Sequence, residues 1–541
     1  METTFTQVVK EIEEGKTAIG IEFGTTRIKA VMVDSNCKPV ASGDFEWENH
    51  LIDGYWTYSV EEIWNGIQEA FVALINDTRE KYNVELKTAG CIGISGMMHG
   101  YMPFDSEEKL LVPFRTWRNS NAHKAAEILT EKFQCNVPDR WSIAHLYQAV
   151  LDNEEHVPEI RTINTLAGYV HQKLGGNRVV GIGEGSGILP TDPESKDYHP
   201  EYVKIFEEII KNEYPDFENL YDLKAVLPGI KLAGEDAGML SEEGAKLLDP
   251  SGQFQPGVPL CPPEGDAETG MIAANAITPR TGNVSLGTSA MAIIVLESAF
   301  EKLHREIDIV ATPLGNNVAM VHGSNCSSDL NHWVNLLAEY SEIMGTPVDK
   351  SEIFGRMFKA ALDSDKDCGG LINYGFLSSE FIADCDAGRP LFVRKENAKF
   401  DIGNFFRAQI YSSFAILGMG VRILKEEEHV EIDYLAGHGG IFKTPVVAQK
   451  LVAGALETPI AISKETAGEG GAWGIAVLAQ FRKQGKETGM DLYQYMDEVA
   501  FKDVAEPETA NPDKEDTAGF KAWLKDFEAG LASERAAIET L

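Results

Sequence analysis

Alternation of apolar and polar residues near the N-terminus predicts a run of strands followed by a helix. Strands are expected over residues 17–23, 27–33 and 40–48, because their branched apolar residues are separated by the turn-forming sequences Gly-Thr-Thr and Asp-Ser-Asn. The Ser-x-x-Glu sequence that begins at Ser59 has the form of a capping box, and apolar residues at helical spacing follow it. Residues 89–95 form the next apolar run. The pattern predicts three antiparallel strands, a helix and a further strand.

The second half of the chain repeats this order. Strands are expected over residues 282–286 and 290–296, on either side of a Gly-Thr-Ser turn. A long apolar-faced helix over 402–424 and a strand over 432–436 follow. This order resembles the ribonuclease-H-like unit of actin-like ATPases, so the repeat predicts an α/β protein with two such domains. Residues 179–198, rich in Gly and Ser, are expected to form a loop that lines a cleft.

The length of 541 residues is too great for a single hydrophobic core. We expect an N-terminal domain over residues 17–281, a C-terminal domain over 282–500 and a helical tail over 501–541.

The formal net charge of −36 argues against nucleic-acid binding, because backbone phosphates are neutralised by basic faces. A nucleotide would meet the same repulsion, so its phosphates would need Mg²⁺ and local backbone donors. The 7 cysteines are scattered and never spaced as Cys-x-x-Cys, which argues against a disulfide framework and a zinc site. The N-terminus is polar, and no apolar run approaches the roughly 20 residues of a membrane helix. We therefore expect a cytoplasmic protein without a membrane partner.

Two turns of similar sequence are candidate phosphate sites. Gly24-Thr25-Thr26 and Gly287-Thr288-Ser289 each follow an apolar strand, and glycine lets backbone N–H groups approach phosphate oxygens closely. A Gly-Thr-Thr hairpin without a phosphate role is the alternative for either turn alone; their repetition favours the phosphate interpretation. Glu22, just before the first turn, could hold Mg²⁺ through water or could be a surface carboxylate at a strand edge.

Asp266 stands in a Gly-containing turn shortly before the second Gly-Thr-hydroxyl turn, which brings a candidate base near a candidate phosphate site. Glycines also cluster in Gly437-His438-Gly439-Gly440 and over residues 468–474, where they suit an adenine ring or a phosphate at a helix N-terminus, or helix packing. The chain has no Walker sequence and no Gly-x-Gly-x-x-Gly after a strand, which argues against P-loop and Rossmann folds.

Two further segments could contact a ligand. His99 follows the strand over 89–95, at the rim where ligand-binding groups gather in open α/β sheets, although a single histidine can equally be structural. Trp117-Arg118-Asn119 combines a flat apolar face, a cation and an amide, a set that suits a polyhydroxylated substrate or a packed helix end.

Taken together, these motifs resemble the FGGY family of carbohydrate kinases, and within it the xylulokinases and ribulokinases. The resemblance covers most of the chain. It runs in the family's order through Gly20-Ile-Glu-Phe-Gly-Thr-Thr26, Gly96-Met-Met-His-Gly100, residues 113–121, Gly265-Asp266, Ser285-Leu-Gly-Thr-Ser289 and Gly437-His-Gly-Gly440.

The resemblance implies the fold of the sugar kinase/Hsp70 superfamily, with ATP and sugar meeting in an interdomain cleft. The N-terminal domain would take the sugar and the C-terminal domain the nucleotide. Asp266 falls on the family's catalytic aspartate, and Met98 and His99 fall on sugar-site positions of xylulokinases. The two Gly-Thr-hydroxyl turns match the phosphate loops, while Gly439 and Gly440 match the adenosine loop.

The chain departs from the family pattern at three positions. Glu22 stands where an aspartate is usual, Asn119 where a substrate-facing aspartate is usual, and Met97 where xylulokinases often have glutamine.

The expected reaction is ATP- and Mg²⁺-dependent phosphorylation of a ketopentose such as xylulose or ribulose. The expected partner is a small-molecule sugar, and a homodimer is allowed. A kinase for a hexulose or a polyol (fuculose, rhamnulose, glycerol, erythritol) and a non-catalytic sugar sensor are the alternatives. An actin-like filament or chaperone ATPase is a third, against which the sugar-site-like region over 95–198 argues.

Overall fold

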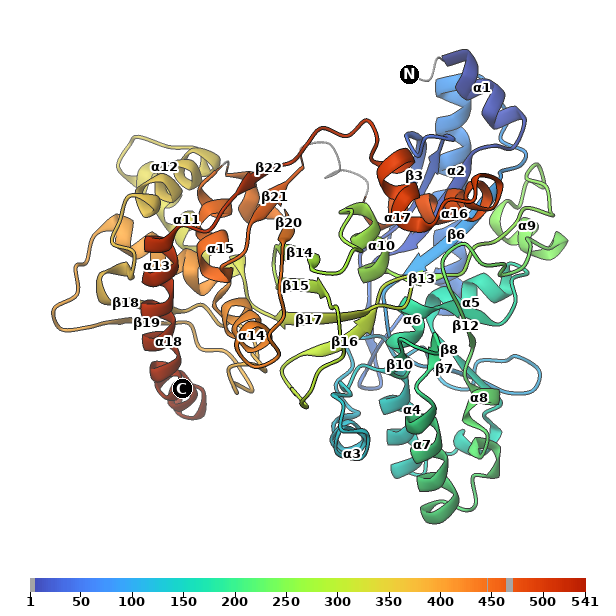
Figure 1. Cartoon of the computed structure of the whole chain (residues 1–541), viewed down its shortest axis with the longest axis horizontal. Helices are drawn as coiled ribbons and strands as arrows, with labels where there is room; N and C mark the ends of the chain where they lie inside the picture. The colour runs from blue at the N-terminus through green and yellow to red at the C-terminus, as the bar shows by residue number, and fades with distance from the viewer. Residues whose placement is uncertain (1–4, 445, 464–469) are drawn as a thin grey trace. The chain divides into compact units, whose positions relative to one another are not determined.

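The computed structural model describes residues 5–444, 446–463 and 470–541. The chain is divided into two compact units (Figure 1). Unit 1 contains Met1–Ile277, Ile309–Asn317 and Gly468–Val504, and unit 2 contains Thr278–Asp308, Val318–Ala467 and Ala505–Leu541. The predicted domain limits do not coincide with these units. Ile309–Asn317 and the segment that begins at Gly468 belong to unit 1, whereas unit 2 begins at Thr278 and includes the C-terminal segment from Ala505.

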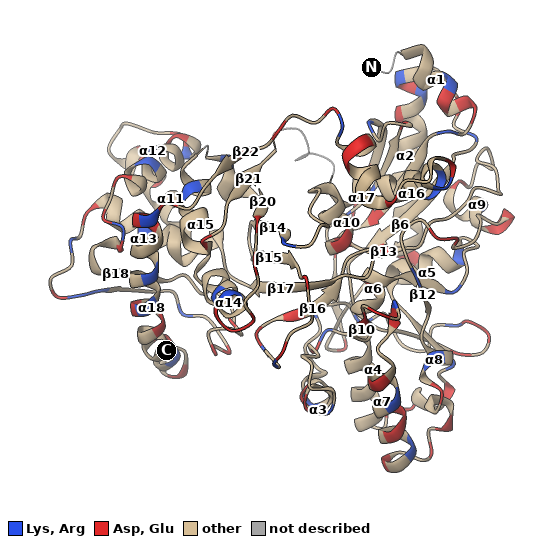
Figure 2. Ribbon diagram, viewed as in Figure 1, with Lys and Arg blue, Asp and Glu red and all other residues tan. Residues whose placement is uncertain are grey.

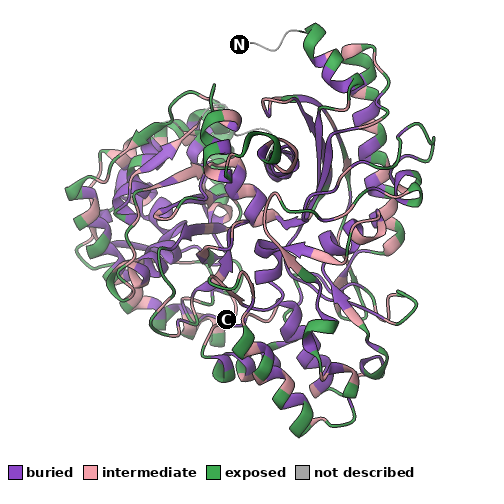
Figure 3. Cartoon of the chain, turned by 45° about the vertical axis from the view of Figure 1, so that its right-hand side comes forward, coloured by how far each residue is buried: buried purple, intermediate pink, exposed green. Residues whose placement is uncertain are grey.

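Unit 1 is built on a five-stranded sheet in the order β13-β6-β1-β2-β3. The strands are β1 (Ala18–Phe23), β2 (Arg27–Val33), β3 (Pro39–Glu46), β6 (Cys91–Gly96) and β13 (Glu264–Gly265). The first three are antiparallel, as the turn signals predict, whereas β6 and β13 run parallel to β1. β1 and β6 are almost completely buried. Buried residues also make up most of the strands drawn in Figure 3.

Helices α2 (Val60–Tyr82) and α16 (Gly470–Thr488) pack against this sheet, where glycines allow close approach. The capping box predicted at Ser59 begins α2. A Cβ added at Gly43 of β3 would lie 2.3 Å from the Ala70 carbonyl oxygen of α2. A Cβ at Gly20 of β1 would lie 2.2 Å from the Ala472 carbonyl oxygen of α16. Both helices are therefore held at backbone distance from the strands.

Unit 2 contains strands in the order β17-β15-β14-β20-β21-β22. They are β14 (Thr281–Leu286), β15 (Ala290–Val295), β17 (Asn317–Gly323), β20 (Tyr434–His438), β21 (Ile460–Ile462) and β22 (Glu508–Ala510). The first three of these are antiparallel, and β14, β20 and β21 are parallel. The order and directions match β3-β2-β1-β6-β13 of unit 1, as the predicted duplication requires.

The remaining elements complete the two units. The other helices of unit 1 are α1 (Phe5–Glu13), α3 (His123–Phe133), α4 (Ser142–Leu151), α5 (Leu166–Lys173), α6 (Ile182–Ser186), α7 (Pro200–Glu213), α8 (Leu223–Val226), α9 (Glu242–Leu248), α10 (Asp266–Ala273) and α17 (Leu492–Tyr495). Those of unit 2 are α11 (Ser327–Ile343), α12 (Lys350–Leu362), α13 (Ile402–Ser412), α14 (Ala415–Glu426), α15 (Val447–Leu456) and α18 (Lys514–Thr540). The other strands are β4 (His50–Ile52), β5 (Tyr55–Thr57), β7 (Met102–Phe104), β8 (Thr162–Asn164), β9 (Val179–Gly181), β10 (Thr191–Asp192), β11 (Asp197–Tyr198), β12 (Gly229–Lys231), β16 (Asp308–Ala311), β18 (Leu371–Tyr374) and β19 (Leu391–Arg394). Asp and Glu residues are spread over the helices and loops of both units (Figure 2).

Two predicted elements are wrong. The helix expected over 402–424 is two helices, α13 and α14, that meet at Phe414, whose backbone leaves the helical region. The loop expected over 179–198 contains α6 and three short strands, and most of its residues are buried.

Candidate active site

Three strands of unit 1 end at one edge of the sheet and bring candidate residues together. Ser95 of β6 lies opposite Glu22 of β1 on one side and opposite Glu264 of β13 on the other. Because these strands are parallel, the residues that follow them lie at the same edge. Gly24 follows β1, and Asp266 follows β13.

Asp266 is the first residue of α10, directly after the cap residue Gly265. Its side chain is partly exposed, and its Oδ1 accepts a hydrogen bond from the Met98 amide at 3.3 Å. Burial raises the pKa of Asp266 to about 6, against the opposing effect of backbone N–H groups. A carboxylate with a pKa just below neutrality is ionised at pH 7 and is a stronger base than an exposed one.

Glu22 is close to Asp266 and is held by the start of α16. Its Oε2 accepts a hydrogen bond from the Ala472 amide at 3.1 Å. Gly471 leaves room for the carboxylate, since a Cβ there would lie 2.1 Å from Glu22 Oε1 and 2.7 Å from Thr269 Oγ1. Burial, and then the charge of Asp266, raise the pKa of Glu22 to about 7.

The turn Gly24-Thr25-Thr26 is fixed through its backbone carbonyls. The Trp47 indole donates to the Gly24 oxygen at 2.8 Å, and the Tyr58 hydroxyl donates to the Thr25 oxygen. The Gly24 amide closes the hairpin on the Arg27 carbonyl at 3.0 Å. Thr25 is half-buried and Thr26 is exposed, so the turn presents its threonine side chains outward from a rigid backbone.

The matching turn of unit 2, Gly287-Thr288-Ser289, is fixed by the start of α11. The Ser327 hydroxyl and amide both donate to the Gly287 oxygen, at 2.6 and 3.1 Å. The Cys326 amide donates to the Thr288 oxygen at 3.0 Å. Thr288 is exposed and Ser289 half-buried, the reverse of the order in the first turn.

Gly439 and Gly440 follow β20, the parallel neighbour of β14, and therefore lie at the same edge of the unit 2 sheet as the Gly287 turn. Gly439 has φ +108 and ψ 176, a conformation that only glycine adopts readily. A Cβ there would lie 2.4 Å from the Leu286 carbonyl oxygen, so this glycine packs directly against the end of β14. Next to it, the Asn283 amide lies 3.1 Å from His438 Nε2.

Met98 and His99 lie at the same edge as Asp266, but both side chains are buried. His99 has φ +67, and its Nδ1 is 3.2 Å from the Gly187 carbonyl oxygen at the end of α6. Its ring stacks on Trp141 with 6.1 Å between centroids. Burial lowers the pKa of His99 well below its ordinary value, so the ring is neutral and packs as part of the core.

The segment Trp117-Arg118-Asn119 is joined to the β4–β5 hairpin. Asn119 is 3% exposed, and its side-chain amide bonds to the backbone N–H and C=O of Trp56 at 2.8 and 2.9 Å. The Arg118 guanidinium stacks on the Trp56 ring at 3.8 Å. Trp117 is 37% exposed and Arg118 is exposed. Asn119 thus positions the hairpin, whereas its two neighbours present side chains at the surface.

The β4–β5 hairpin itself was not predicted. Its turn residues, Asp53 and Gly54, both have positive φ, as the type I′ form of a two-residue hairpin turn requires. The Asp-Gly pair flanked by apolar residues was therefore the signal for this element. The segment over 468–474 proposed for a nucleotide is described only from Gly470; Gly468 and Glu469 lie outside the described residues.

Comparison with known protein families shows to which family the chain belongs. The N-terminal domain of the FGGY family of carbohydrate kinases matches residues 17–271, and the C-terminal domain matches residues 282–482. The chain belongs to the FGGY family of carbohydrate kinases. The kinase is therefore a sugar phosphotransferase, and the family predicted from the motifs is confirmed.

Individual relatives of this FGGY kinase share little sequence with it. Xylulose kinase of Haemophilus influenzae is 20% identical over 420 residues, which cover 75% of this chain and 80% of that protein. The crystal structure of ligand-bound xylulose kinase from Lactobacillus acidophilus has a TM-score of 0.75 at 17% identity, over 97% of this chain and 98% of its own. Plasmodium falciparum glycerol kinase with ADP has a TM-score of 0.73 at 16% identity, over 96% and 98%. These likenesses confirm the predicted two-domain α/β fold.

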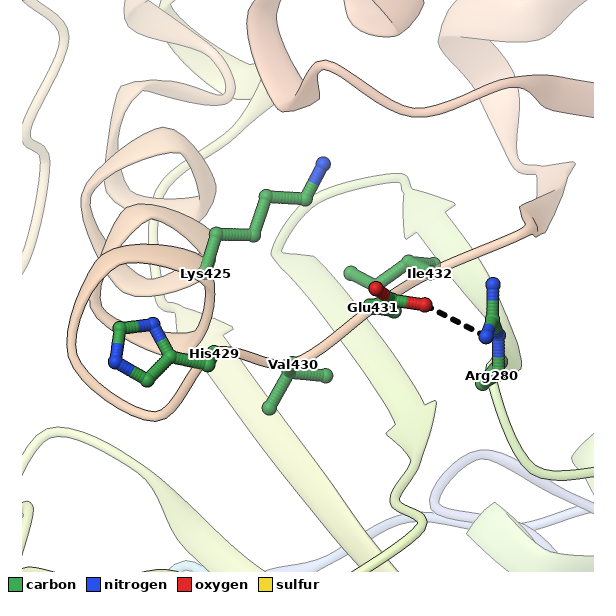
Figure 4. Close-up of a pocket in the computed structure, with 6 residues that line it drawn as sticks. All are labelled: Arg280, Lys425, His429, Val430, Glu431 and Ile432. Atoms are coloured by element: carbon green, nitrogen blue, oxygen red, sulfur yellow. Dashed lines mark ion pairs between the residues drawn. The ribbon is translucent and has the colours of Figure 1, made fainter.

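A pocket of about 530 Å³ in unit 2 of the FGGY kinase lies away from its candidate loops (Figure 4). Arg280, Lys425 and residues 429–432 line it, and Arg280 pairs with Glu431 at 2.6 Å. Arg280 and Ile432 come just before β14 and β20, whereas the Gly287 and Gly439 turns follow the other ends of these strands. The pocket is therefore at the opposite edge of the sheet. Among the residues that the structure describes, no helix of this FGGY kinase has the length and apolarity to cross a membrane.

Proposed function

We propose that this FGGY kinase transfers the γ-phosphate of ATP to a hydroxyl of a ketopentose such as xylulose or ribulose. The observation that carries the proposal is the position of Asp266, an ionisable carboxylate that binds the Met98 amide at the sheet edge where the Gly24 turn also lies. The choice of a ketopentose is supported by the xylulose kinase relatives in sequence and fold.

Asp266 acts as the general base in this proposal. Its carboxylate accepts the proton of the sugar hydroxyl as the hydroxyl oxygen attacks the γ-phosphorus of ATP. A P–O bond forms to the sugar, the bond between the γ-phosphorus and the bridging oxygen breaks, and ADP leaves. Phosphoryl transfer depends mainly on positioning and on neutralising charge, and the base adds about 10²- to 10⁴-fold.

Each Gly-Thr-hydroxyl turn offers hydroxyl and amide donors that suit the phosphates of ATP. Both are suited to this role because neighbouring side chains and the start of α11 already fix their backbones. Gly439 and Gly440 take the adenosine side in unit 2, next to the end of β14. Fixed local donors are needed because the chain carries a net charge of −36.

Glu22 fits a role in holding Mg²⁺. Among the described residues no group of three or more His, Cys, Asp or Glu side chains forms a metal cage. Mg²⁺ is usually held by one or two carboxylates, water and substrate phosphates, so a single carboxylate suits it. The pKa of Glu22, raised to about 7, agrees with a place where a cation would stabilise the ionised form. When bound, Mg²⁺ neutralises charge on the ATP phosphates.

The Gly471→Ala substitution tests whether the space beside Gly471 is needed to position the Glu22 carboxylate. The new methyl group would collide with the carboxylate, and we expect a loss of about 1–3 kcal/mol in stability, typical of overpacking. We also expect a higher Mg²⁺ concentration for half-maximal activity. Thermal unfolding and a Mg²⁺ titration of activity measure both. Gly355→Ala is the matched control, because Gly355 also lies within a helix and a Cβ added there would have no described atom within 4 Å. Equal behaviour of the two variants would contradict the assignment.

On the sugar side, Trp117 and Arg118 contact the substrate directly in this proposal, because their side chains are exposed. Three buried residues support the site without contacting the sugar. The Met98 amide binds Asp266, His99 contacts the end of α6, and Asn119 binds the β4–β5 hairpin.

A polyol kinase is the second candidate, favoured by the likeness of the fold to glycerol kinase. A panel of D- and L-xylulose, D- and L-ribulose, L-fuculose, L-rhamnulose, glycerol and erythritol, with ADP release from Mg-ATP as the readout, separates the two. We expect one ketopentose to stimulate turnover strongly. Preference for glycerol or erythritol would overturn the ketopentose assignment, and a flat panel with intact ATP binding would favour a sugar sensor.

A further inference from the structure

Three glutamates of unit 1 lie in the protein interior behind Asp266. Glu184 of α6 and Glu268 of α10 are 0% exposed, and Glu264 of β13 is 1% exposed. Glu268 stands two residues after Asp266, and Glu264 two residues before it. None of the three is assigned a role in the proposed reaction.

Two glycines show how closely the three carboxyl groups approach one another. A Cβ at Gly265 would lie 2.4 Å from Glu268 Oε2 and 2.9 Å from Glu184 Oε2. A Cβ at Gly183 would lie 2.7 Å from Glu264 Oε2 and 2.9 Å from Glu268 Cδ. The three side chains therefore converge on the glycines that begin α10 and α6.

No cation of the described chain offsets this group. Within that part of the chain, no Lys, Arg or His forms an ion pair with any of the three glutamates. Both oxygens of Glu184, both of Glu268 and Oε1 of Glu264 have no hydrogen-bond partner there. Glu264 Oε2 accepts the Glu184 amide at 2.9 Å and so binds the start of α6. Nor do the described residues offer three side chains placed to bind a metal.

Among the described residues, no cation is one of the groups that shift the pKa of the three carboxyls, although Arg482 acts on the neighbouring Cys261 and Arg178 on the neighbouring Tyr198. The titratable groups that face the three carboxyls are Asp266, Cys261 and Tyr198. The Thr165 hydroxyl lies near Glu184 without the geometry of a hydrogen bond, and its nearness opposes the rise of the Glu184 pKa. Burial, followed by the other carboxylates, raises the pKa of Glu264 and Glu268 well above the ordinary value, and burial does the same for Glu184. Unpaired ionised carboxylates are costly in such a place, so burial and mutual repulsion favour the neutral acids.

We propose that Glu184, Glu264 and Glu268 are positioning residues for Asp266, which hold the junction of β13 and α10 against α6 as neutral acids and release it when they ionise. The inference rests on the proposed role of Asp266. Ionised carboxylates would repel one another and the Asp266 carboxylate. This repulsion would act at Gly265, the residue that caps α10. Met98 would be displaced together with Gly265, because the two residues are in close contact: a Cβ added at Gly265 would lie 2.3 Å from Met98 Cγ.

The kinetic test compares the wild type with Glu184→Gln, Glu268→Gln and the double variant. Glutamine keeps the shape of a neutral acid but cannot ionise. We expect kcat/KM between about pH 5 and about pH 10 to be bell-shaped for the wild type. The variants should keep neutral-pH activity within about twofold and lose less activity on the alkaline side. An alkaline limb unchanged in all three variants would overturn the proposal.

A stability test does not depend on turnover. The folded state keeps these protons above the ordinary glutamate pKa of 4.5, where the unfolded chain loses them. The contribution of these three groups to stability is therefore fully present below that pH and is lost as pH rises, so on the alkaline side the unfolding midpoint of the glutamine variants should fall less steeply than that of the wild type. If Asp266→Asn retains turnover but this difference persists, the proposed base is wrong while the neutral acids stand.

Glu534→Gln is the matched control. Glu534 is also 0% exposed with a pKa raised by burial, but it lies in α18 of unit 2. Its substitution should alter the pH dependence of stability and leave the alkaline limb of kcat/KM in place. Should a glutamine variant not fold, the wild type alone decides the matter. Its infrared spectrum at pH 8 should show the carbonyl stretch of protonated carboxylic acids, and absence of that band would refute the neutral cluster.

Discussion

In the Asp266→Asn variant we expect kcat for sugar-dependent ADP formation to fall by about 10²- to 10⁴-fold. Asparagine keeps the shape of the side chain, and its oxygen can still accept the Met98 amide, but it cannot take the proton of the sugar hydroxyl. ATP should bind as in the wild type, because Asp266 makes no contribution to the nucleotide loops of unit 2 in the proposed mechanism. Coupled ADP assays and equilibrium ATP titration measure the two effects.

The pH profile separates loss of the base from general damage. Because burial raises the pKa of Asp266 to about 6, wild-type kcat/KM should fall below that pH as the carboxylate is protonated. The residual activity of Asp266→Asn should lack this acid limb. Asp384→Asn is a suitable control, since Asp384 is exposed with φ +52, a conformation that asparagine tolerates equally well. Turnover near the wild-type level in Asp266→Asn would remove Asp266 from the role of base.

Local sequence patterns predicted the helices and strands that are determined by residues close together in the sequence. Strands β1, β2, β14 and β15 alternate around Gly-Thr-hydroxyl turns, and the capping box at Ser59 begins α2, so short windows were sufficient. The break at Phe414 could not be found in this way. The apolar stripe continues from α13 into α14, and periodicity alone does not reveal a change of helix axis.

Residues whose partners are distant in the sequence make contacts that the sequence did not indicate. Gly471 was considered for a nucleotide loop, but its lack of a side chain leaves room for Glu22, which is over 400 residues away. Asn119 was considered for substrate, yet its amide is occupied by Trp56 of a hairpin that was not predicted. Glu184 lies in a Gly-rich stretch that resembles an exposed loop, and only the tertiary structure shows that it is buried. These roles depend on long-range contacts that a sequence pattern does not encode.

For Gly439→Ala we expect weaker ATP binding together with lower stability. The backbone at φ +108 and ψ 176 costs a residue with a side chain about 1–3 kcal/mol. The added methyl group would also lie 2.4 Å from the Leu286 carbonyl oxygen and push β20 away from the end of β14. Gly287 directly follows Leu286 in the sequence. The strain would therefore affect both proposed nucleotide loops of unit 2, the Gly287 turn and the Gly439 turn. Each ~1.4 kcal/mol lost from ATP binding raises Kd tenfold, and we expect at least that change in an ATP titration.

Gly440→Ala shows whether the effect comes from this contact or from loss of any glycine in the turn. Gly440 does not have positive φ, and a Cβ added there would have no atom of the described chain within 4 Å. Its substitution should leave the thermal midpoint unchanged, whereas Gly439→Ala should lower it. A further substitution, Leu286→Ala, shortens the side chain but keeps the carbonyl that Gly439 meets, so it should not relieve the strain. If Gly439→Ala binds ATP normally despite a lower midpoint, the turn after β20 supports the sheet and does not bind the nucleotide.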